Sequence, residues 1–370
     1  MKPWVEKMGG IETAASAVSP AVRGLFASGP AGRVSFSEQA SATDPIDHTI
    51  LIKDAEEVET VYARLRQAAA VGMKPHYIVV EGLGVFTVSD AQEKRGTRLG
   101  GRVALVTGGA QGFGEGIARE LAGAGAVVVI ADLNLALAEA VATALNALHG
   151  AGSAMALAVD VGKEDSVQRL IEQTVLRFGG LDLLVSNAGV LRAGGLEEMT
   201  LDAFEFVTRI NYSAFFLMTK YGSRPMKIQA RFDTHYSSDV VQINSKSGLE
   251  GSNKNFAYAG GKFGGIGLVQ SFAKELVEHR IKVNAICPGN FYEGPLWSDP
   301  EKGLFVQYLK AGKVPGAKTV QDVYDFYVAK VPMGRGCSPV DVTRAIVYCV
   351  EQLYETGQAI PVTGGQNMLK

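Results

Sequence analysis

Cysteine is scarce in this chain of 370 residues, where only Cys287, Cys337 and Cys349 occur. Three cysteines cannot form the disulfide framework of a small secreted protein. So few are typical of a chain that works in a reducing cytosol. We therefore expect a cytoplasmic location.

Long apolar runs and a strong excess of charge are also missing. No apolar run approaches the roughly 20 residues that cross a bilayer, and residues 1–24 hold no apolar core of signal-peptide length. The net charge of −2 gives no reason to expect nucleic acid or an anionic membrane as a partner. The composition, 47% hydrophobic and 20% charged, is typical of a globular protein with a sizeable core.

Apolar runs and helical patterns alternate regularly from about Arg102 to the end of the chain. We expect strands over residues 102–109, 127–132, 153–161, 181–189, 239–245, 281–289 and 358–365, and helices over 114–126, 135–150, 164–180, 201–220, 256–279, 319–330 and 340–353. Such alternation predicts parallel βαβ units. The fold class is therefore α/β, a doubly wound parallel sheet of about seven strands.

Residues 1–99 do not share this alternation. The expected elements are a strand over 48–53, a helix over 54–72 with Asp54 as a candidate N-cap, and one strand or two over 76–88. A Pro-, Gly- and Ser-rich stretch precedes them over residues 19–45, and a polar, glycine-rich linker follows over 89–101. We predict a small α/β appendage over 1–99 and the sheet domain over 100–370.

A glycine-rich segment, "TGGAQGFG", lies between the first expected strand and helix of the sheet domain. Gly108, Gly112 and Gly114 have the spacing G-x3-G-x-G. Glycines there allow a tight turn and let backbone N–H groups approach a pyrophosphate at a helix N-terminus. An ordinary strand–helix turn is the alternative.

Asp132 ends the second strand, eighteen residues after Gly114. A carboxylate there suits the adenosine ribose hydroxyls and repels a 2′-phosphate. The residues that follow are Leu133 and Asn134, so no arginine is available for that phosphate. We predict NAD(H) over NADP(H), with a helix cap as the alternative role of Asp132.

Tyr258 and Lys262 lie four residues apart on an expected helix, so they share one face. A free tyrosine has a pKa near 10, and a nearby ammonium lowers it. Ser245, thirteen residues before the tyrosine, is placed to hydrogen-bond a substrate oxygen while Tyr258 moves the proton. The alternative is an ordinary surface Tyr–Lys pair.

These motifs occur in an order that resembles the short-chain dehydrogenase/reductase superfamily. The resemblance rests on the glycine motif, Asp160–Val161, "SNAG" at 186–189 and Ser245…Tyr258-x3-Lys262, and it covers about residues 99–370. It implies a Rossmann fold, binding of the nicotinamide ribose by Lys262, and a water relay organised by Asn211. The cofactor site that it implies comprises Gly108, Gln111, Gly112, Phe113, Gly114, Asp132, Leu133, Asp160, Val161, Asn187, Ala188, Gly189, Tyr258, Lys262, Pro288 and Gly289.

A narrower resemblance concerns "QINSKSG", "NAICPGNFYEGPLW", "VPMGRGC" and "GQAIPVTGGQNM". They resemble the bacterial sorbitol-6-phosphate 2-dehydrogenase family, which implies oxidation of a hexitol phosphate to fructose 6-phosphate. The segment after Pro288–Gly289 lacks the superfamily's threonine for the nicotinamide carboxamide. The candidate substrate contacts are Ser245, Lys246, Asn290, Glu293, Trp297 and Arg335, with Lys246 and Arg335 for the phosphate. Loop structure is the alternative for Asn290, Glu293 and Trp297, and plain solvation is the alternative for Lys246 and Arg335.

Glycines crowd the helix around Lys262, at positions 260, 261, 264, 265 and 267. The superfamily resemblance implies that this helix packs against its counterpart in a neighbouring subunit, so we expect a homo-oligomer, either a dimer or a homotetramer.

"DPIDHTILIK" and "PHYIVVEGLGVFTV" resemble the C-terminal end of class II aldolase domains. Those aldolases bind zinc through three histidines, two of them as His-x-His. The chain's five histidines, His48, His76, His149, His235 and His279, form no such pair. We therefore expect no metal site and a remnant used for packing or assembly. The fusion of such domains to dehydrogenases suggests a lactaldehyde dehydrogenase as the second hypothesis. A non-catalytic dinucleotide-binding scaffold is the third, disfavoured by the intact Ser245, Tyr258 and Lys262.

Overall fold

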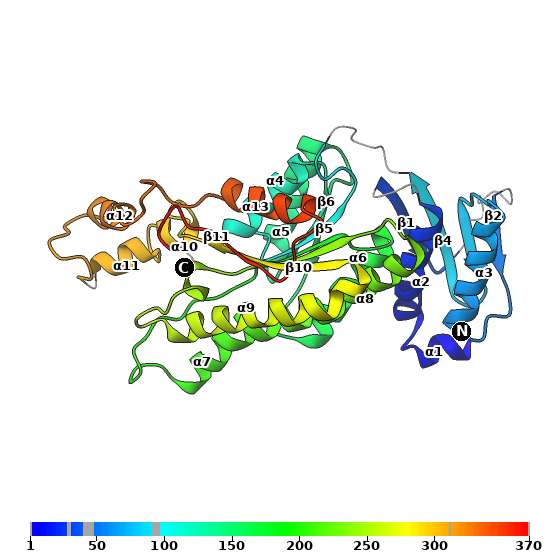
Figure 1. The fold of residues 1–370 in the computed structure, drawn as a ribbon, viewed down its shortest axis with the longest axis horizontal. Coiled ribbons are helices and arrows are strands. Elements are labelled where there is room, and N and C mark those ends of the chain that lie inside the picture. Colours follow the sequence, from blue (N-terminus) through cyan, green and yellow to red (C-terminus); the bar gives the residue numbers. More distant parts are fainter. Residues whose placement is uncertain (1, 28–30, 40–47, 91–96, 311, 369–370) are drawn as a thin grey trace.

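The computed structural model describes residues 2–27, 31–39, 48–90, 97–310 and 312–368. Parts of the predicted linker and of the Pro-, Gly- and Ser-rich stretch lie outside these ranges. Along its long axis the molecule has three parts (Figure 1): an N-terminal α/β part, a central sheet covered by helices, and a small helical projection. No helix among the described residues has the length and apolarity needed to span a membrane.

The central sheet has seven strands in the order β11-β10-β9-β8-β5-β6-β7. Its strands are β5 (Val103–Thr107), β6 (Val127–Asp132), β7 (Ala154–Ala158), β8 (Leu183–Ser186), β9 (Ser238–Ile243), β10 (Ile281–Pro288) and β11 (Ala359–Val362). Every pairing is parallel. The predicted doubly wound fold is confirmed. Strands β5 to β7 are added toward one edge of the sheet and β8 to β11 toward the other, so the order switches between β5 and β8. Ligands bind at this switch point in folds of this kind.

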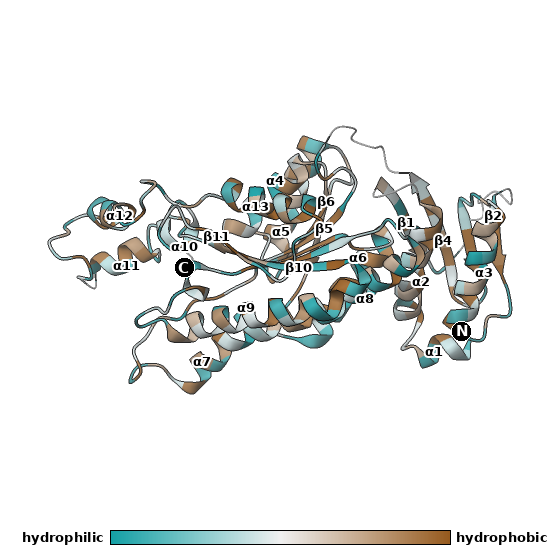
Figure 2. Cartoon of the chain, in the orientation of Figure 1, coloured by the Kyte–Doolittle hydropathy of each residue, from teal (hydrophilic) through white to brown (hydrophobic). Residues whose placement is uncertain are grey.

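Helices cover both faces of this sheet, and each face has its own apolar core. One face carries α4 (Gly112–Gly123), α5 (Leu135–His149) and α13 (Pro339–Glu351). The other carries α6 (Glu164–Phe178), α8 (Ala214–Phe232) and α9 (Phe256–Leu276). Figure 2 colours each residue by hydropathy and shows hydrophobic residues along both the strands and the helices of the central domain. Successive strand residues such as Leu105 and Val106 therefore enter opposite cores.

The helix expected over residues 201–220 is longer and less regular. It consists of α7 (Leu201–Thr208), one π-helical turn (Arg209–Ser213) and α8, which ends only at Phe232. The last turns of α8 continue because Met226, Ala230 and Phe232 are buried. The π turn rotates Asn211 into the protein, and such turns are frequent at functional sites.

The N-terminal part has a sheet of four strands in the order β1-β4-β3-β2, covered by helices. Its elements are α1 (Pro3–Lys7), α2 (Ile11–Phe26), β1 (Gly32–Ser37), β2 (Thr49–Ile52), α3 (Val58–Ala70), β3 (Tyr77–Val80) and β4 (Gly84–Asp90). The segment 76–88 thus forms two strands. Asp54 as an N-cap is wrong: α3 begins at Val58 after Glu57, and Asp54 has a φ of 56° in the turn before it.

This N-terminal part packs directly against the central domain. Helix α2 lies on α6 and α8, and β1 lies on α6. The ring of Phe232 at the end of α8 lies 4.9 Å from that of Tyr62 on α3. Arg23 of α2 and Asp182, which precedes β8, form a buried ion pair at 2.8 Å.

The helical projection contains α10 (Pro295–Ser298), α11 (Leu304–Lys310) and α12 (Val320–Val328). Only α12 corresponds to a helix predicted from the sequence. We call residues 291–310 and 312–331 the lid. Its own apolar cluster comprises Tyr292, Trp297, Leu304, Phe305, Val314, Val323 and Val331.

Candidate active site

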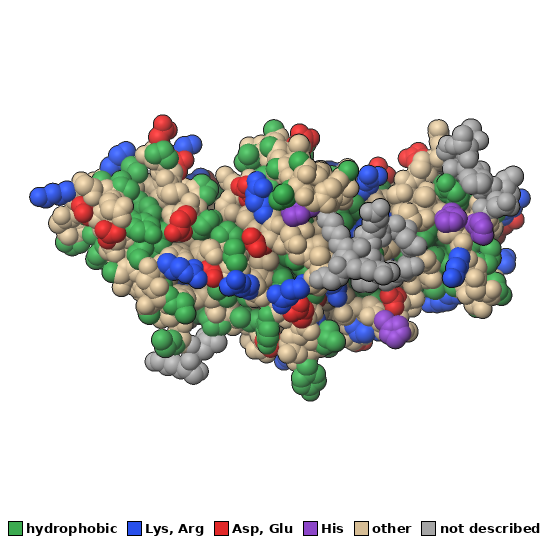
Figure 3. All heavy atoms as spheres, turned by 90° about the horizontal axis from the view of Figure 1, so that it is seen from above, with side chains coloured by type: hydrophobic (Ala, Val, Ile, Leu, Met, Phe, Trp, Pro, Cys, Tyr) green, Lys and Arg blue, Asp and Glu red, His purple; other side chains and the backbone are tan. Residues whose placement is uncertain are grey.

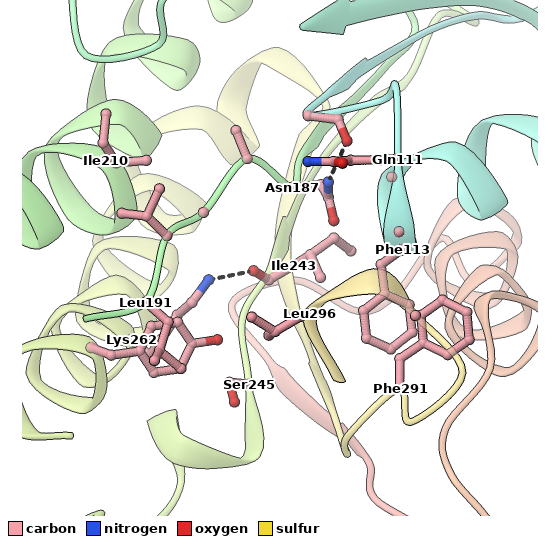
Figure 4. Close-up of a pocket in the computed structure, with 18 of the residues that line it drawn as sticks. Gln111, Phe113, Asn187, Leu191, Ile210, Ile243, Ser245, Lys262, Phe291 and Leu296 are labelled. Carbon is pink, nitrogen blue, oxygen red and sulfur yellow. Dashed lines mark hydrogen bonds between the residues drawn. The ribbon is translucent and has the colours of Figure 1, made fainter. Parts of the chain in front are cut away.

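A cavity of about 1040 Å³ opens at the carboxyl ends of the central strands (Figure 4). Every residue predicted to bind the cofactor lines this cavity, and so do Ser245, Lys246, Asn290 and Trp297. The lid also contributes Lys302, together with residues that the sequence analysis did not single out, among them Leu296 and Tyr308. No sequence signal marked them, because α10 and α11 were not predicted.

The glycine-rich turn brings its backbone close to itself at the start of α4. Gly108 and Gly112 have φ values of 62° and 60°, in the left-handed region. A Cβ on Gly114 would lie 1.9 Å from the carbonyl oxygen of Gly108, so no side chain fits there. Gln111, the N-cap of α4, makes no side-chain capping bond. The first N–H groups of α4 therefore face the cavity wall without a side-chain acceptor from their own cap.

Thr107 and Asn187 join this turn to the end of β8. The Thr107 hydroxyl accepts the N–H groups of Asn187 and Ala188 at 3.0 and 3.1 Å. The Asn187 amide donates to the Thr107 and Gly108 carbonyl oxygens at 2.9 and 3.2 Å. Thr107 was missed by the sequence analysis, although it directly precedes the first glycine.

Asp132 lines the cavity and is held by two backbone donors. Its carboxylate accepts the N–H of Ala110 at 3.1 Å and the N–H of Asn134 at 3.0 Å. The alternative role of Asp132 as a helix cap is wrong, because Asn134 caps α5 by accepting the N–H of Leu137 at 3.1 Å.

Ser245, Tyr258 and Lys262 meet on one wall of the cavity. Ser245 follows β9, and its hydroxyl accepts the N–H of Ser247 at 3.1 Å. Tyr258 and Lys262 extend from α9, with the Lys262 ammonium 5.5 Å from the centroid of the Tyr258 ring. The Lys262 side chain is 4% exposed and donates to the Ile243 carbonyl at 2.8 Å, as Figure 4 shows.

Burial dominates the acid–base properties of this group. It lowers the pKa of Lys262 to about 8. It also raises the pKa of Tyr258, and a hydrogen bond with Ser245 offsets only part of that rise. The lower tyrosine pKa expected from Lys262 is thus not what the structure gives, because both side chains are withdrawn from water.

Asn211 is buried behind this wall and does not itself line the cavity. Its amide donates to the carbonyl oxygens of Val190 and Val207 at 2.7 and 3.0 Å, and its oxygen accepts the N–H of Val190 at 3.2 Å. A Cβ on Gly189 would lie 2.8 Å from that oxygen and 3.9 Å from the Lys262 ammonium, so both groups flank Gly189.

Two of the predicted substrate contacts do not reach the cavity. Arg335 is engaged by Asp341 in a two-point ion pair at 2.6 and 2.9 Å, beside a separate hollow. Its prediction as a phosphate ligand is corrected, because its guanidinium already has a carboxylate partner. Glu293 is exposed and does not line the cavity. Trp297 does line it, but its ring also packs on Tyr292 and Phe305, each at 5.1 Å.

The glycines around Lys262 differ in the space beside them, and Gly261 has only an ordinary contact, at 3.5 Å from Asn211. A Cβ on Gly264 would lie 2.7 Å from the Tyr212 ring, and one on Gly265 would lie 2.5 Å from the Gln242 amide. Contacts within the chain therefore require these two. Gly260 and Gly267 have open space beside them.

Histidine, cysteine, aspartate and glutamate form no group of three or more suited to a metal among the residues that the structure describes. Figure 3 shows acidic and basic side chains interspersed over one face.

Residues 102–299 match the family described as short chain dehydrogenase. The match spans more than half of the 370 residues, and the chain belongs to this family. It is an oxidoreductase of the class that acts on a CH–OH group of a small molecule with a nicotinamide dinucleotide.

Three known proteins illustrate what this chain is similar to. Sorbitol-6-phosphate 2-dehydrogenase of Escherichia coli K12 is 36% identical over 72% of this chain and 99% of that protein. The crystal structure of sorbitol-6-phosphate 2-dehydrogenase from Erwinia amylovora is also 36% identical, over 72% of this chain and 100% of that one, with a TM-score of 0.65. The NADP complex of RhlG from Pseudomonas aeruginosa is 28% identical, with a TM-score of 0.62 over 72% of this chain and 97% of that one.

Proposed function

We propose that this chain is an NAD-dependent oxidoreductase that interconverts sorbitol 6-phosphate and fructose 6-phosphate. The observation that carries the proposal is the position of Ser245, Tyr258 and Lys262 on one wall of a cavity whose other wall is the glycine-rich turn. The 36% identity to a sorbitol-6-phosphate 2-dehydrogenase over 99% of its length supports the choice of substrate.

The residues of the cavity fit a dinucleotide and its chemistry. The uncapped N–H groups of α4 would hold the pyrophosphate, and Asp132 would hold the adenosine ribose. When bound, the nicotinamide would supply the hydride acceptor for the carbinol carbon. Tyr258, as the phenolate, would take the proton of the same carbinol hydroxyl and so become a neutral phenol, while the Ser245 hydroxyl holds that oxygen in place. The Lys262 ammonium would stabilise the phenolate before this transfer and would contact the nicotinamide ribose.

The preference for NAD rests on Asp132. Its carboxylate is fixed by two backbone N–H groups at the cavity wall. A 2′-phosphate placed against it would meet a negative charge with no arginine directly after the strand.

Lys246 is proposed to bind the phosphate of the substrate. It lines the cavity beside Ser245, and its side chain has neither an ion pair nor a hydrogen bond to another described residue. Burial lowers the pKa of its ammonium, the neighbouring Lys330 lowers it further, and Glu250 opposes them. A phosphate would supply the anion that this ammonium lacks.

Purified protein tests the assignment in one assay. Formation of NADH or NADPH is followed with sorbitol 6-phosphate and with lactaldehyde, each with NAD and with NADP. We expect the highest kcat/KM for sorbitol 6-phosphate with NAD. Faster turnover of lactaldehyde favours the lactaldehyde dehydrogenase hypothesis, a preference for NADP contradicts the role of Asp132, and no turnover of any alcohol favours a scaffold.

Assembly and the N-terminal part complete the proposal. We propose a cytoplasmic homodimer or homotetramer that joins through α8 and α9, where Phe216 and Phe263 are 44% and 47% exposed. We propose that residues 1–99 are a remnant of a class II aldolase domain, used for packing or assembly, beside a dehydrogenase domain over 100–370. The relatives above leave more than a quarter of the chain unmatched. Sedimentation of the purified protein tests the assembly.

A further inference from the structure

Two phenylalanine rings meet at the edge of the cofactor cavity. Phe113 belongs to the first turn of α4, and Phe291 follows β10 at the start of the lid. Their centroids lie 4.9 Å apart with 33° between the ring planes, and both rings line the cavity. Figure 4 shows them side by side, on the opposite side of the cavity from Lys262. This contact joins the glycine-rich turn to the lid.

Packing against the apolar core holds the Phe113 side chain in place. Its side chain packs against the apolar core that α4, α5 and α13 share with the sheet. It directly follows Gly112, whose φ of 60° sets the direction in which α4 leaves the turn. The ring therefore stands beside the uncapped N–H groups at the start of α4.

Phe291 is held between two anchored neighbours. The Asn290 carbonyl accepts the N–H of Cys337 at 2.8 Å. Tyr292 is 1% exposed, and its hydroxyl donates to the Tyr327 carbonyl at 3.0 Å. The chain then turns at Gly294, where a Cβ would lie 2.5 Å from the Phe291 ring. The loop thus fixes the ring against Phe113 and connects it directly to the buried cluster of the lid.

The second contact between these loops lies next to the first. A Cβ on Gly112 would be 3.9 Å from Cδ of Pro295, the first residue of α10. The glycine-rich turn and the lid therefore touch at two adjacent residues of the α4 N-terminus, Gly112 and Phe113. The rings offer no charge and no hydrogen bond to a pyrophosphate there, so their role is to enclose it rather than to bind it.

We propose that Phe113 and Phe291 form an aromatic clasp that holds the lid against the glycine-rich turn and slows the release of the bound dinucleotide. The proposal rests on the dinucleotide site proposed above. It assigns both residues as positioning residues: they act on the residence time of the cofactor and not on proton transfer.

Stopped-flow measurement of dinucleotide release tests the clasp without any alcohol substrate. Prebound NADH is displaced by excess NAD, and the dissociation rate is followed by NADH fluorescence in the wild type, Phe113→Leu, Phe291→Leu and the double variant. An aromatic pair of this kind corresponds to a change of about two- to tenfold. We expect each single variant to release NADH faster by that factor. The double variant should be no faster than the faster single one, because the pair is lost only once.

Two further variants make the result specific. Phe291→Tyr keeps the ring and should release NADH at close to the wild-type rate. Phe326→Leu removes another aromatic ring of the lid, one that packs on Tyr327 and under Lys330 instead. It should leave the rate unchanged. Thermal unfolding of each variant identifies any that fails to fold, and the leucine variant that does fold then carries the test, with Phe291→Tyr as its control.

The outcomes separate the clasp from the proposed function. Unchanged release in both single leucine variants overturns the clasp, and so does a double variant whose acceleration equals the product of the single ones. If the wild type binds NADPH better than NADH, the same measurement uses NADPH, and only the role of Asp132 fails. Failure to oxidise sorbitol 6-phosphate leaves the test intact, because no alcohol is present. A wild type that binds neither dinucleotide overturns both proposals.

Discussion

The two ends of the central sheet bury their cations in opposite ways. At the carboxyl ends of the strands, Lys262 donates to a backbone carbonyl and has no carboxylate bonded to it within the described part of the chain. At the amino ends, Arg23 of the N-terminal part is 2% exposed and holds both carboxylate oxygens of Asp182, at 2.8 and 3.1 Å. Asp182 also accepts the N–H of Val103, at the start of β5, at 2.7 Å.

The pKa values follow from this difference. Burial lowers the pKa of Lys262 to about 8, because the opposing contribution of Cys287 is smaller than the cost of removing the ammonium from water. Burial alone would raise the pKa of Asp182, but the charge and the hydrogen bonds of Arg23 outweigh it, and the pKa lies below its usual value. A buried cation without a counter-ion marks a site that an incoming group completes, whereas one with a full set of partners marks structure.

The largest effect is expected at the carboxyl end. Tyr258→Phe removes only the hydroxyl that moves the proton, so kcat should fall about a hundred- to ten-thousandfold. NADH affinity and the free energy of unfolding should stay near the wild-type values. Steady-state rates, fluorescence titration and urea unfolding measure the three quantities. If the variant keeps more than about a tenth of the wild-type rate, a difference of ~1.4 kcal/mol, the proton-transfer role is wrong.

At the amino ends of the central strands, a substitution should reduce stability and leave cofactor binding unchanged. Arg23→Met leaves the Asp182 charge buried without its partner, which costs about 3–5 kcal/mol of unfolding free energy. NADH binding by the folded fraction should be unchanged. Arg231→Met is the matched control, because Arg231 pairs with Glu59 on the surface, where the side chains are 45% and 50% exposed. That pair is worth at most about 1 kcal/mol. Equal losses in the two variants would contradict a special role for the buried pair.

Lowering the pH should reduce the difference in unfolding free energy between the wild type and Arg23→Met. The folded pKa of Asp182 is depressed, so its stabilising contribution is present above the unfolded value of about 3.9 and is lost as the pH falls through the folded pKa. In the variant the buried carboxylate is destabilising at pH 7 and harmless once protonated. Urea unfolding at neutral pH and near pH 4 measures both gaps. A gap independent of pH would show that the charge of Asp182 is not the cause.

A smaller effect is expected where a substrate phosphate would meet Lys246. Lys246→Ala should raise KM for sorbitol 6-phosphate by about ten- to a hundredfold, the size of a charge-assisted hydrogen bond of roughly 1.5–3 kcal/mol. KM for a free hexitol should change little. Arg335→Ala is the control, since that guanidinium is paired with Asp341 away from the cavity. If both variants leave the ratio of kcat/KM between the two substrates unchanged, the phosphate is bound elsewhere.

No metal-dependent activity is expected from the N-terminal part. Metal analysis of the purified protein should find no stoichiometric zinc, and a retro-aldol assay on rhamnulose 1-phosphate should find no cleavage. Treatment with a chelator should then leave dehydrogenase turnover unchanged. Stoichiometric zinc together with cleavage would overturn the interpretation of residues 1–99 as a packing remnant.

The central domain could be predicted because its signals are local. Alternating apolar runs and helical patterns place the strands, and the parallel connection rule then brings Gly108, Asp132 and Tyr258 to the same end of the sheet. The N-terminal part gave weaker signals. Helix α2 contains Pro20, which ordinarily ends a helix, and its stability comes from burial of Ala14, Val18 and Val22 against other elements.

Side-chain pairing and burial that no sequence pattern announces explain the remaining differences. The partner of Arg23 is Asp182, far along the chain, so no pattern within α2 announces it. Arg335 was read as a free cation because its carboxylate belongs to the first turn of α13. The raised pKa of Tyr258 depends on burial by the whole cavity wall, which spacing along a helix does not reveal.

The phosphate preference of the wild type is the most direct test of the whole account. The quantity is the ratio of kcat/KM for sorbitol 6-phosphate to kcat/KM for sorbitol, with NAD, from initial rates of NADH formation. The ammonium of Lys246 at the cavity wall predicts a ratio of about ten or more. A ratio near one would contradict the assignment to a hexitol phosphate and make lactaldehyde the better substrate hypothesis.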